Sequence, residues 1–230
     1  MKSFKALSAL LSYPSADLQA VVPEIRAILH DEGHFGPRKL AGLEPLFNWL
    51  ANHDLYELEE TYVLIFDRAR TLSLNLFEHI HGESRDRGGA MVDLLETYRA
   101  GGFDLTGPEL PDHLPVLLEF LSTQTEPQAR EILQDAGAIL VALAERLTRR
   151  ESPYAAVLAA LVDFAKADPA TEAAQALLAE PLDDPTDLAA LDATYAEAQV
   201  MFGPDPTAGC PAARDVLARM APSPALVATS

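Results

Sequence analysis

Apolar residues recur at the spacing of an α-helix along most of this chain, and this periodicity constrains its fold more than any other feature. One such stripe consists of Ile132, Ala136, Ile139, Leu140, Leu143 and Leu147. No run of alternating β-branched residues, which would indicate strands, competes with this pattern. Because helices with a single apolar stripe must bury it against one another, the pattern predicts an all-α fold, a single-domain helical bundle of about eight to ten helices.

The sequence changes character from Asp168 onward. Alanine-rich stretches there are interrupted by Pro169, Pro181, Pro185, Pro204, Pro206, Pro211, Pro222 and Pro224. Proline restricts helix continuation, and alanine contributes little apolar surface to a core. We therefore expect a helical domain over residues 1–166 and an Ala/Pro-rich, partly ordered arm over residues 167–230, with room for one short helix at 188–202.

The chain is acidic, with 35 Asp and Glu residues against 17 Lys and Arg and a formal net charge of -18. Such a charge repels phosphate backbones and anionic lipid headgroups, so we expect neither nucleic acid binding nor membrane insertion. The same field would speed encounter with a basic peptide, but an acidic surface also serves solubility. Charge alone therefore leaves both interpretations open.

Cysteine content and hydropathy indicate the cellular compartment in which the protein works. The single cysteine, Cys210, excludes an intrachain disulfide and any cysteine cluster for zinc or iron–sulfur, which fits a reducing environment. The apolar run at residues 6–11 is too short for a secretion signal, and no stretch approaches the roughly 20 apolar residues that cross a bilayer. We therefore expect a cytoplasmic protein.

Two central segments concentrate charged residues and histidines beside aromatic and aliphatic ones. They are residues 73–88, SLNLFEHIHGESRDRG, and residues 109–121, ELPDHLPVLLEFL. Gly88-Gly89 lacks the Lys-Ser/Thr ending of a phosphate loop, and no Gly-x-Ser-x-Gly nucleophile motif is present. The two segments are more typical of a surface that binds another chain, so we predict no enzymatic activity.

The second segment contains a helix start. Asp112 lies between Pro111 and Pro115, and proline is tolerated only in the first turn of a helix. This predicts Asp112 as the N-cap, accepting a hydrogen bond from a free amide. The cap does not account for Glu109, His113 and Glu119 around the same turn, which suggest one wall of a peptide groove.

A metal-dependent hydrolase and a helical adaptor for another basic client are the alternatives. His30, His53 and Asp54 invite comparison with HD-type phosphohydrolases, which need a His, a His-Asp pair and a distant Asp. His53 is equally suited to a helix C-terminus, and Asp54 to capping the next helix. His79 and His81 could share a metal only in a bent segment, and such residues more often hydrogen-bond nearby backbone.

Several of these stretches occur together, and in order, in one known family. They are residues 10–14, 62–67, 73–88, 90–95 and 109–114. In this combination the chain resembles the nitrate reductase molybdenum cofactor assembly chaperones of the NarJ type, within the redox-enzyme maturation chaperones (TorD/DmsD-like). The resemblance is firm over residues 62–121 and looser from the N-terminus to Lys166.

The resemblance implies an all-helical chaperone that binds the N-terminus of the catalytic (alpha) subunit of respiratory nitrate reductase. It would keep the apo-enzyme competent for molybdenum cofactor insertion and complex assembly, with molybdenum cofactor biosynthesis proteins as further partners. It implies no cofactor for the chaperone itself. In the broader family a Glu-x-Pro-Asp-His element lies near the site for the client's leader peptide, and residues 109–113 match it.

These arguments together define a candidate client-peptide site. An apolar side of the client would contact aromatic and aliphatic residues, while carboxylates would meet its positive charges. The candidate residues are Tyr62, Phe66, Leu76, Phe77, His81, Glu83, Arg85, Asp86, Glu109, Asp112, His113 and Glu119.

Overall fold

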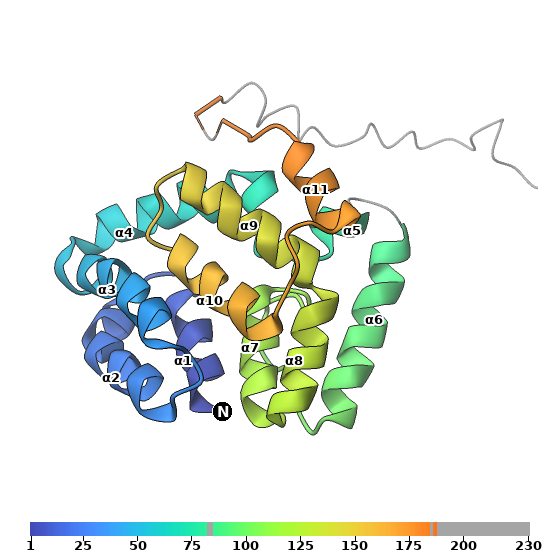
Figure 1. The fold of residues 1–230 in the computed structure, drawn as a ribbon, viewed down its shortest axis with the longest axis horizontal. Coiled ribbons are helices and arrows are strands. Elements are labelled where there is room, and N and C mark those ends of the chain that lie inside the picture. The colour runs from blue at the N-terminus through green and yellow to red at the C-terminus, as the bar shows by residue number, and fades with distance from the viewer. Residues whose placement is uncertain (82–84, 185, 188–230) are drawn as a thin grey trace, which may run out of the picture. The chain divides into compact units, whose positions relative to one another are not determined.

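A computed structural model of the chain describes residues 1–81, 85–184 and 186–187, with the backbone alone described for Arg85. The predicted all-α fold is confirmed, because the described residues form eleven α-helices and no β-strand (Figure 1). These helices are α1 (Lys2–Leu10), α2 (Ala16–Glu32), α3 (Pro37–Asn52), α4 (Leu55–Tyr62), α5 (Glu78–His81), α6 (Arg85–Ala100), α7 (Leu114–Thr123), α8 (Glu126–Asp135), α9 (Gly137–Arg149), α10 (Ala155–Ala165) and α11 (Glu172–Ala179). None of them is both long and apolar enough to cross a membrane.

Local sequence signals set several helix ends. The Ser15 side chain accepts a hydrogen bond from the Leu18 N–H at the start of α2, at 3.1 Å. Gly33 ends the same helix with a φ of 69°, in the left-handed region that glycine adopts without a steric penalty. Thr125 and Gln128 form a capping box at the start of α8. These ends explain why the apolar stripes break where they do.

One continuous core lies between the helices. Helix α1 packs against α2 and α7, while α10 packs against α3, α8 and α9 (Figure 1). The fully buried leucines that these helices contribute include Leu7, Leu10, Leu43, Leu46, Leu118, Leu121, Leu140, Leu143, Leu158 and Leu161. Burying one such side chain stabilises a fold by about 1.5–3 kcal/mol, so the apolar stripes provide the main driving force.

Helix α4 continues into a π-helical turn, η1 (Val63–Asp67), which is followed by a short 3-10 helix, η2 (Arg70–Leu72). The widened turn is closed by a hydrogen bond from the Arg68 N–H to the Val63 carbonyl, at 2.9 Å. Just before it, the Tyr62 hydroxyl donates to the Leu11 carbonyl at 2.9 Å and attaches α4 to the end of α1. Single π-turns inside helices are frequent at functional sites, and this one ends at Asp67.

Helix α11 packs against α9. Arginines of α9 and of the residue after it attach the segment that follows α11 to the rest of the domain. Arg146 is 1% exposed, and its guanidinium donates to the Thr71 carbonyl at 2.8 Å and pairs with Glu180 at 2.9 Å. The Thr71 N–H donates to the Asp183 carboxylate at 2.7 Å. Residues 1–187 form one compact unit, which includes α11, and the predicted domain boundary at Lys166 lies before that helix. The rest of the expected arm, residues 188–230, lies outside the described residues.

Candidate functional site

The structure brings the two central segments side by side. The Leu76 N–H donates to the Asp112 carbonyl at 3.0 Å, and the Leu114 N–H donates to the Leu74 carbonyl at 2.8 Å. These bonds form a single antiparallel bridge between Asn75 and His113. Residues separated by more than 30 positions in the chain therefore share one site.

Asp112 is the buried centre of this pairing. Its carboxylate is 0% exposed, accepts a hydrogen bond from the Phe77 N–H at 3.1 Å and lies 3.8 Å from the Arg87 guanidinium. Burial raises the pKa of Asp112, although the Phe77 N–H and the positive charge of Arg87 act in the opposite direction. The prediction that Asp112 caps the following helix is wrong, because His113 is the N-cap residue of α7 and the Asp112 carboxylate reaches across to Phe77 instead.

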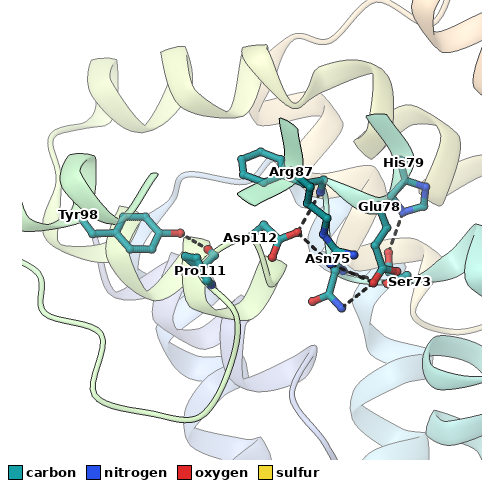
Figure 2. A network of polar contacts seen from close by, with 9 residues as sticks. Ser73, Asn75, Glu78, His79, Arg87, Tyr98, Pro111 and Asp112 are labelled. Carbon is teal, nitrogen blue, oxygen red and sulfur yellow. Dashed lines mark hydrogen bonds and ion pairs between the residues drawn. The ribbon is translucent and has the colours of Figure 1, made fainter. Parts of the chain in front are cut away.

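A polar network surrounds Asp112, and Figure 2 shows it extending from Tyr98 past Asp112 and Arg87 to His79. Arg87 donates to the Glu78 carboxylate at 3.1 Å, and the Asn75 amide donates to the same oxygen at 3.4 Å. Burial alone would raise the pKa of Glu78, but the hydrogen bond from Ser73 and the charge of Arg87 outweigh burial and lower it. Glu78 therefore stays ionised beside Arg87.

At each end of this network a side chain is hydrogen-bonded to a backbone carbonyl. The His79 Nε2 donates to the Ser73 carbonyl at 2.8 Å, which confirms the backbone role expected for this histidine. Burial lowers the pKa of His79, so its neutral form is favoured. At the other end the buried Tyr98 hydroxyl donates to the Pro111 carbonyl at 2.6 Å and attaches α6 to the loop before α7. We call Ser73, Asn75, Glu78, His79, Arg87, Tyr98 and Asp112 the polar network.

A surface hollow of about 440 Å³ lies next to the polar network. The end of α1, the end of η1, the loop before α7 and the first turns of α7 form it. We call it the acidic hollow; it is lined by Ser8, Ser12, Tyr13, Tyr62, Asp67, Glu109, His113, Pro115, Val116 and Glu119. The Ser8 hydroxyl donates to the Pro115 carbonyl at 2.7 Å and so holds two of its walls together.

Three carboxylates, Asp67, Glu109 and Glu119, lie beside one histidine in the acidic hollow. His113 Nδ1 lies 3.7 Å from the Glu109 carboxylate, and burial lowers the pKa of His113 although Glu109, Asp112 and Asp67 act in the opposite direction. Loss of hydration raises the pKa of Asp67; His113 opposes this shift and Glu109 adds to it. Glu119 pairs with Lys5 at 3.3 Å, at the exposed rim. Negative charge therefore dominates the hollow at neutral pH.

The predicted site residues fall into several groups. The acidic hollow includes Tyr62, Glu109, His113 and Glu119, and the polar network includes Asp112. Phe77 and His81 are partly buried against each other, with ring centroids 5.8 Å apart, and Asp86 is exposed at the start of α6.

The expected apolar contact surface differs from what the structure shows. Tyr62, Phe66 and Leu76 are buried core residues, so they do not form an exposed apolar face for a client. Tyr62 touches the hollow from the core side, with its ring 4.9 Å from that of Phe66. The predicted positions Glu83 and the Arg85 side chain lie outside the described residues.

Sequence reasoning missed Ser12, Tyr13 and Asp67 as site residues. Tyr13 is 50% exposed, and its ring lies 5.4 Å from that of Tyr62. A signal was available, because Tyr13 and Asp67 belong to the stretches 10–14 and 62–67 that carry the family resemblance. Their position beside His113 depends on tertiary packing, which that signal does not contain.

The hydrolase alternative does not gain support from the geometry. His30 Nε2 lies 3.7 Å from Glu44, and His53 Nδ1 lies 3.1 Å from the Trp49 carbonyl. Asp54 caps α4, because its side chain accepts from the Tyr56 N–H at 2.9 Å. Within the described part of the chain, no group of three or more His, Cys, Asp or Glu residues could hold a metal ion.

Comparison with known proteins bears on the fold first and on the family second. A solved structure from Archaeoglobus fulgidus, whose proposed role is redox enzyme maturation, has the same fold with a TM-score of 0.53 at 22% identity, covering 72% of this chain and 94% of that one. Residues 17–160 match the family described as nitrate reductase delta subunit, and the chain belongs to this family.

Curated relatives match along most of their length. The nitrate reductase molybdenum cofactor assembly chaperone NarJ of Escherichia coli (strain K12) is 39% identical over 204 residues, which are 88% of this chain and 86% of the relative. A second protein of that strain, NarW, is named as a probable chaperone of the same kind and is 37% identical over 211 residues, 91% of this chain and 87% of the relative.

Proposed function

We propose that this chain is an assembly chaperone for a nitrate reductase. In this proposal it binds the N-terminal segment of the catalytic subunit in the acidic hollow and keeps the apo-enzyme competent for molybdenum cofactor insertion. The relatives named as nitrate reductase assembly chaperones support the role in assembly. The acidic hollow supports the mode of binding. Contact with molybdenum cofactor biosynthesis proteins belongs to the same proposal.

The observation that carries the binding mode is the grouping of Asp67, Glu109 and Glu119 around one hollow. Carboxylates gathered on one surface attract a basic segment and speed its encounter, and the formal charge of -18 adds to this field. The half-exposed Tyr13 ring offers apolar and aromatic contact in the same place. Such a surface fits a segment that is both basic and partly apolar.

The proposed client segment is a flexible peptide, and this sets the expected strength of binding. Ordering a flexible segment consumes part of the interaction free energy, so affinity per unit of contact area is low. Moderate affinity suits a chaperone, because the client must leave once maturation is complete. The partial exposure of the hollow's carboxylates also makes the interaction sensitive to salt.

Isothermal titration calorimetry with a synthetic peptide of the catalytic subunit's N-terminus tests this function. The double variant Asp67→Asn/Glu109→Gln removes two charges from the hollow with little change in shape. We expect its affinity to fall about tenfold, since each lost charge contact is worth about 0.5–1 kcal/mol.

A matched control separates local charge from overall charge. Glu131→Gln/Asp135→Asn removes two exposed charges from α8, which does not line the hollow, and we expect its affinity to stay within about twofold of wild type. Equal losses in both double variants would show that only the overall charge matters. An absence of binding to the wild-type chain would refute the proposal.

A further inference from the structure

The segment after α11 is held to the domain by polar contacts more than by apolar burial. We call residues 177–184 the strap; all of them are described, and every side chain among them is at least partly exposed. Helix α11 itself buries Ala174 and leaves its other residues partly or fully exposed. Segments with few buried apolar contacts open at a low free-energy cost. We therefore expect the strap to detach before the helical core unfolds.

Two arginines hold the strap. Arg146 of α9 donates to the Leu177 carbonyl and pairs with the Glu180 carboxylate at 2.9 Å. Arg150, which follows α9, donates to the Asp183 carbonyl. Because the Arg146 side chain is almost completely buried, it gives the strap a rigid anchor within the domain.

The same contacts reach η2. The Thr71 carbonyl accepts from Arg146 at 2.8 Å, and the Thr71 N–H donates to the Asp183 carboxylate at 2.7 Å. The first N–H groups of a helix have no partner within it, so Asp183 supplies one from outside. Loss of the strap would take this partner from the Thr71 N–H and loosen η2.

The short helix η2 connects the strap to the acidic hollow. Asp67, which lines the hollow, ends η1 shortly before η2 begins. Residues 74–76 follow η2 and pair with residues 112–114, which include His113 of the hollow. A loose η2 would therefore loosen the backbone that carries both Asp67 and His113.

His79 lies where the strap and the polar network meet. Its ring donates to the carbonyl of Ser73, directly after η2, as Figure 2 shows. Burial lowers the pKa of His79, and the hydrogen bond to Ser73 opposes this shift. Among the charged groups, Arg146 lowers the pKa further, while Glu78 and Glu180 raise it. Because Glu180 belongs to the strap, the pKa of His79 reports whether the strap is attached.

We propose that the strap is a positioning element for the acidic hollow. While it is attached, it fixes η2 and keeps Asp67 and His113 in the arrangement that lines the hollow. When it detaches, this arrangement loosens and the affinity for a client falls, because only the ordered fraction of the site binds. The effect on affinity rests on the proposed function, whereas the effect on η2 does not.

Two neighbouring acids provide a matched test by hydrogen exchange of the full chain. Asp183 accepts from Thr71, whereas Asp184 is exposed and its side chain accepts from a residue of its own segment. We expect Asp183→Ala to speed the exchange of the amides of residues 72–76, and of Leu114 across the bridge, about tenfold or more. Asp184→Ala should change these rates less than about twofold, and the amides of α10 should exchange as in wild type in both variants.

The exchange rates can also contradict the proposal. Equal rates at residues 72–76 in the two variants, or unchanged rates in Asp183→Ala, would overturn it. A matching rise in α10 would overturn it as well, because the strap would then contribute to the stability of the whole domain and not to the position of η2. Far-ultraviolet circular dichroism checks that each variant keeps its helical content.

The pKa of His79 gives a readout that a general loss of stability does not move. Glu180→Gln removes a charge that raises the pKa of His79, so proton NMR should show a lower pKa than in wild type. Glu172→Gln, a matched change in the first turn of α11, should leave the pKa unchanged. An unchanged pKa of His79 in Glu180→Gln would show that the strap does not lie against this segment and would overturn the proposal.

Calorimetry with the synthetic N-terminal peptide of the catalytic subunit tests the effect on the hollow. We expect Asp183→Ala to weaken binding about fivefold or more and Asp184→Ala less than about twofold, although each variant loses one charge. Faster exchange at residues 72–76 with unchanged affinity would overturn the link between strap and hollow and leave the chaperone function standing. A wild-type chain that does not bind the peptide would refute the proposed function, and hydrogen exchange would still decide whether the strap positions η2.

Discussion

Two adjacent residues, Asp112 and His113, belong to regions with opposite character. Asp112 is fully buried in the polar network, where the Phe77 N–H and Arg87 partner its carboxylate. His113 lines the acidic hollow beside Glu109. One step along the backbone therefore separates a carboxylate buried within the fold from a side chain that lines a surface hollow.

The difference between the two regions lies in how their charges are compensated. In the polar network Asp112 and Glu78 both face Arg87, so a cation of the same chain compensates part of their negative charge. In the acidic hollow carboxylates outnumber cations on a partly exposed surface. Substitutions in the network should therefore lower stability, whereas substitutions in the hollow should lower binding with little loss of stability.

The largest expected effect comes from breaking the network at its centre. Asp112→Ala removes the acceptor of the Phe77 N–H and leaves Arg87 with one carboxylate instead of two. We expect the free energy of unfolding to fall by about 2–4 kcal/mol, the usual cost of losing one partner of a buried charged pair. Urea denaturation measures the change.

Asp112→Asn is the matched control for this prediction. It keeps an oxygen that accepts from the Phe77 N–H and loses only the charge facing Arg87, so its loss of stability should be clearly smaller. Because Asp112 does not line the hollow, the folded Asn variant should bind the client peptide nearly as well as wild type. A large loss of affinity with normal stability would place Asp112 in the binding surface instead.

Tyr98→Phe should have a smaller effect on the same network. The change removes the hydroxyl that donates to the Pro111 carbonyl and keeps the buried ring, which packs 4.7 Å from Phe120. We expect a loss of about 1 kcal/mol, typical of one hydrogen bond in a buried position. Thermal unfolding detects a change of this size, and an unchanged melting temperature would show that the bond contributes nothing net.

The helices were predictable from the sequence because their signal is local. Apolar periodicity, caps such as Ser15 and Thr125 and breaks such as Gly33 act within a few residues, so the all-α fold follows from reading along the chain. Glu109 and His113 were predicted as site residues because charges and histidines cluster around the same turn, and both line the acidic hollow.

The rest of the site depends on contacts between distant segments. The bridge between residues 74–76 and 112–114 pulls the Asp112 carboxylate toward Phe77, which local cap rules do not foresee. Tyr62 and Phe66 are aromatic residues of a type that is common in binding surfaces, yet core packing buries them. Tyr13 and Asp67 reach the hollow only because α1 and η1 meet there.

Acid should weaken the network through His79. Burial lowers the pKa of His79 in the folded chain, so the stability that its neutral form contributes is present above the ordinary histidine pKa of about 6.5 and is lost as the pH falls through the folded value. Arg146 adds to this shift, while Glu78 and Glu180 oppose it. We expect the free energy of unfolding to decrease on acidification from pH 7.5 to 5.5.

The variant His79→Gln checks the origin of this decrease. An uncharged amide can still donate toward the Ser73 carbonyl but does not titrate, so the pH dependence should be shallower than in wild type. His113 contributes in the same direction, because burial lowers the pKa of His113 as well, and the double variant with His113→Gln should be shallower still. A slope that neither variant changes would assign the effect to other groups.

The smallest expected change in stability has the opposite sign and lies in the hollow. Loss of hydration raises the pKa of Asp67 in the folded chain, so the folded state favours the neutral form. The stability given by that form is lost as the pH rises through the folded value, and a neutral Asp67→Asn side chain avoids this loss. At pH 7 we expect the Asn variant to be equal to or slightly more stable than wild type, by less than about 1 kcal/mol, and to bind the client peptide more weakly.

Such opposed changes in denaturation and calorimetry would show that Asp67 is retained for binding at a cost to the fold. A loss of stability in Asp67→Asn would instead place this carboxylate with the polar network, on the structural side of the boundary between Asp112 and His113.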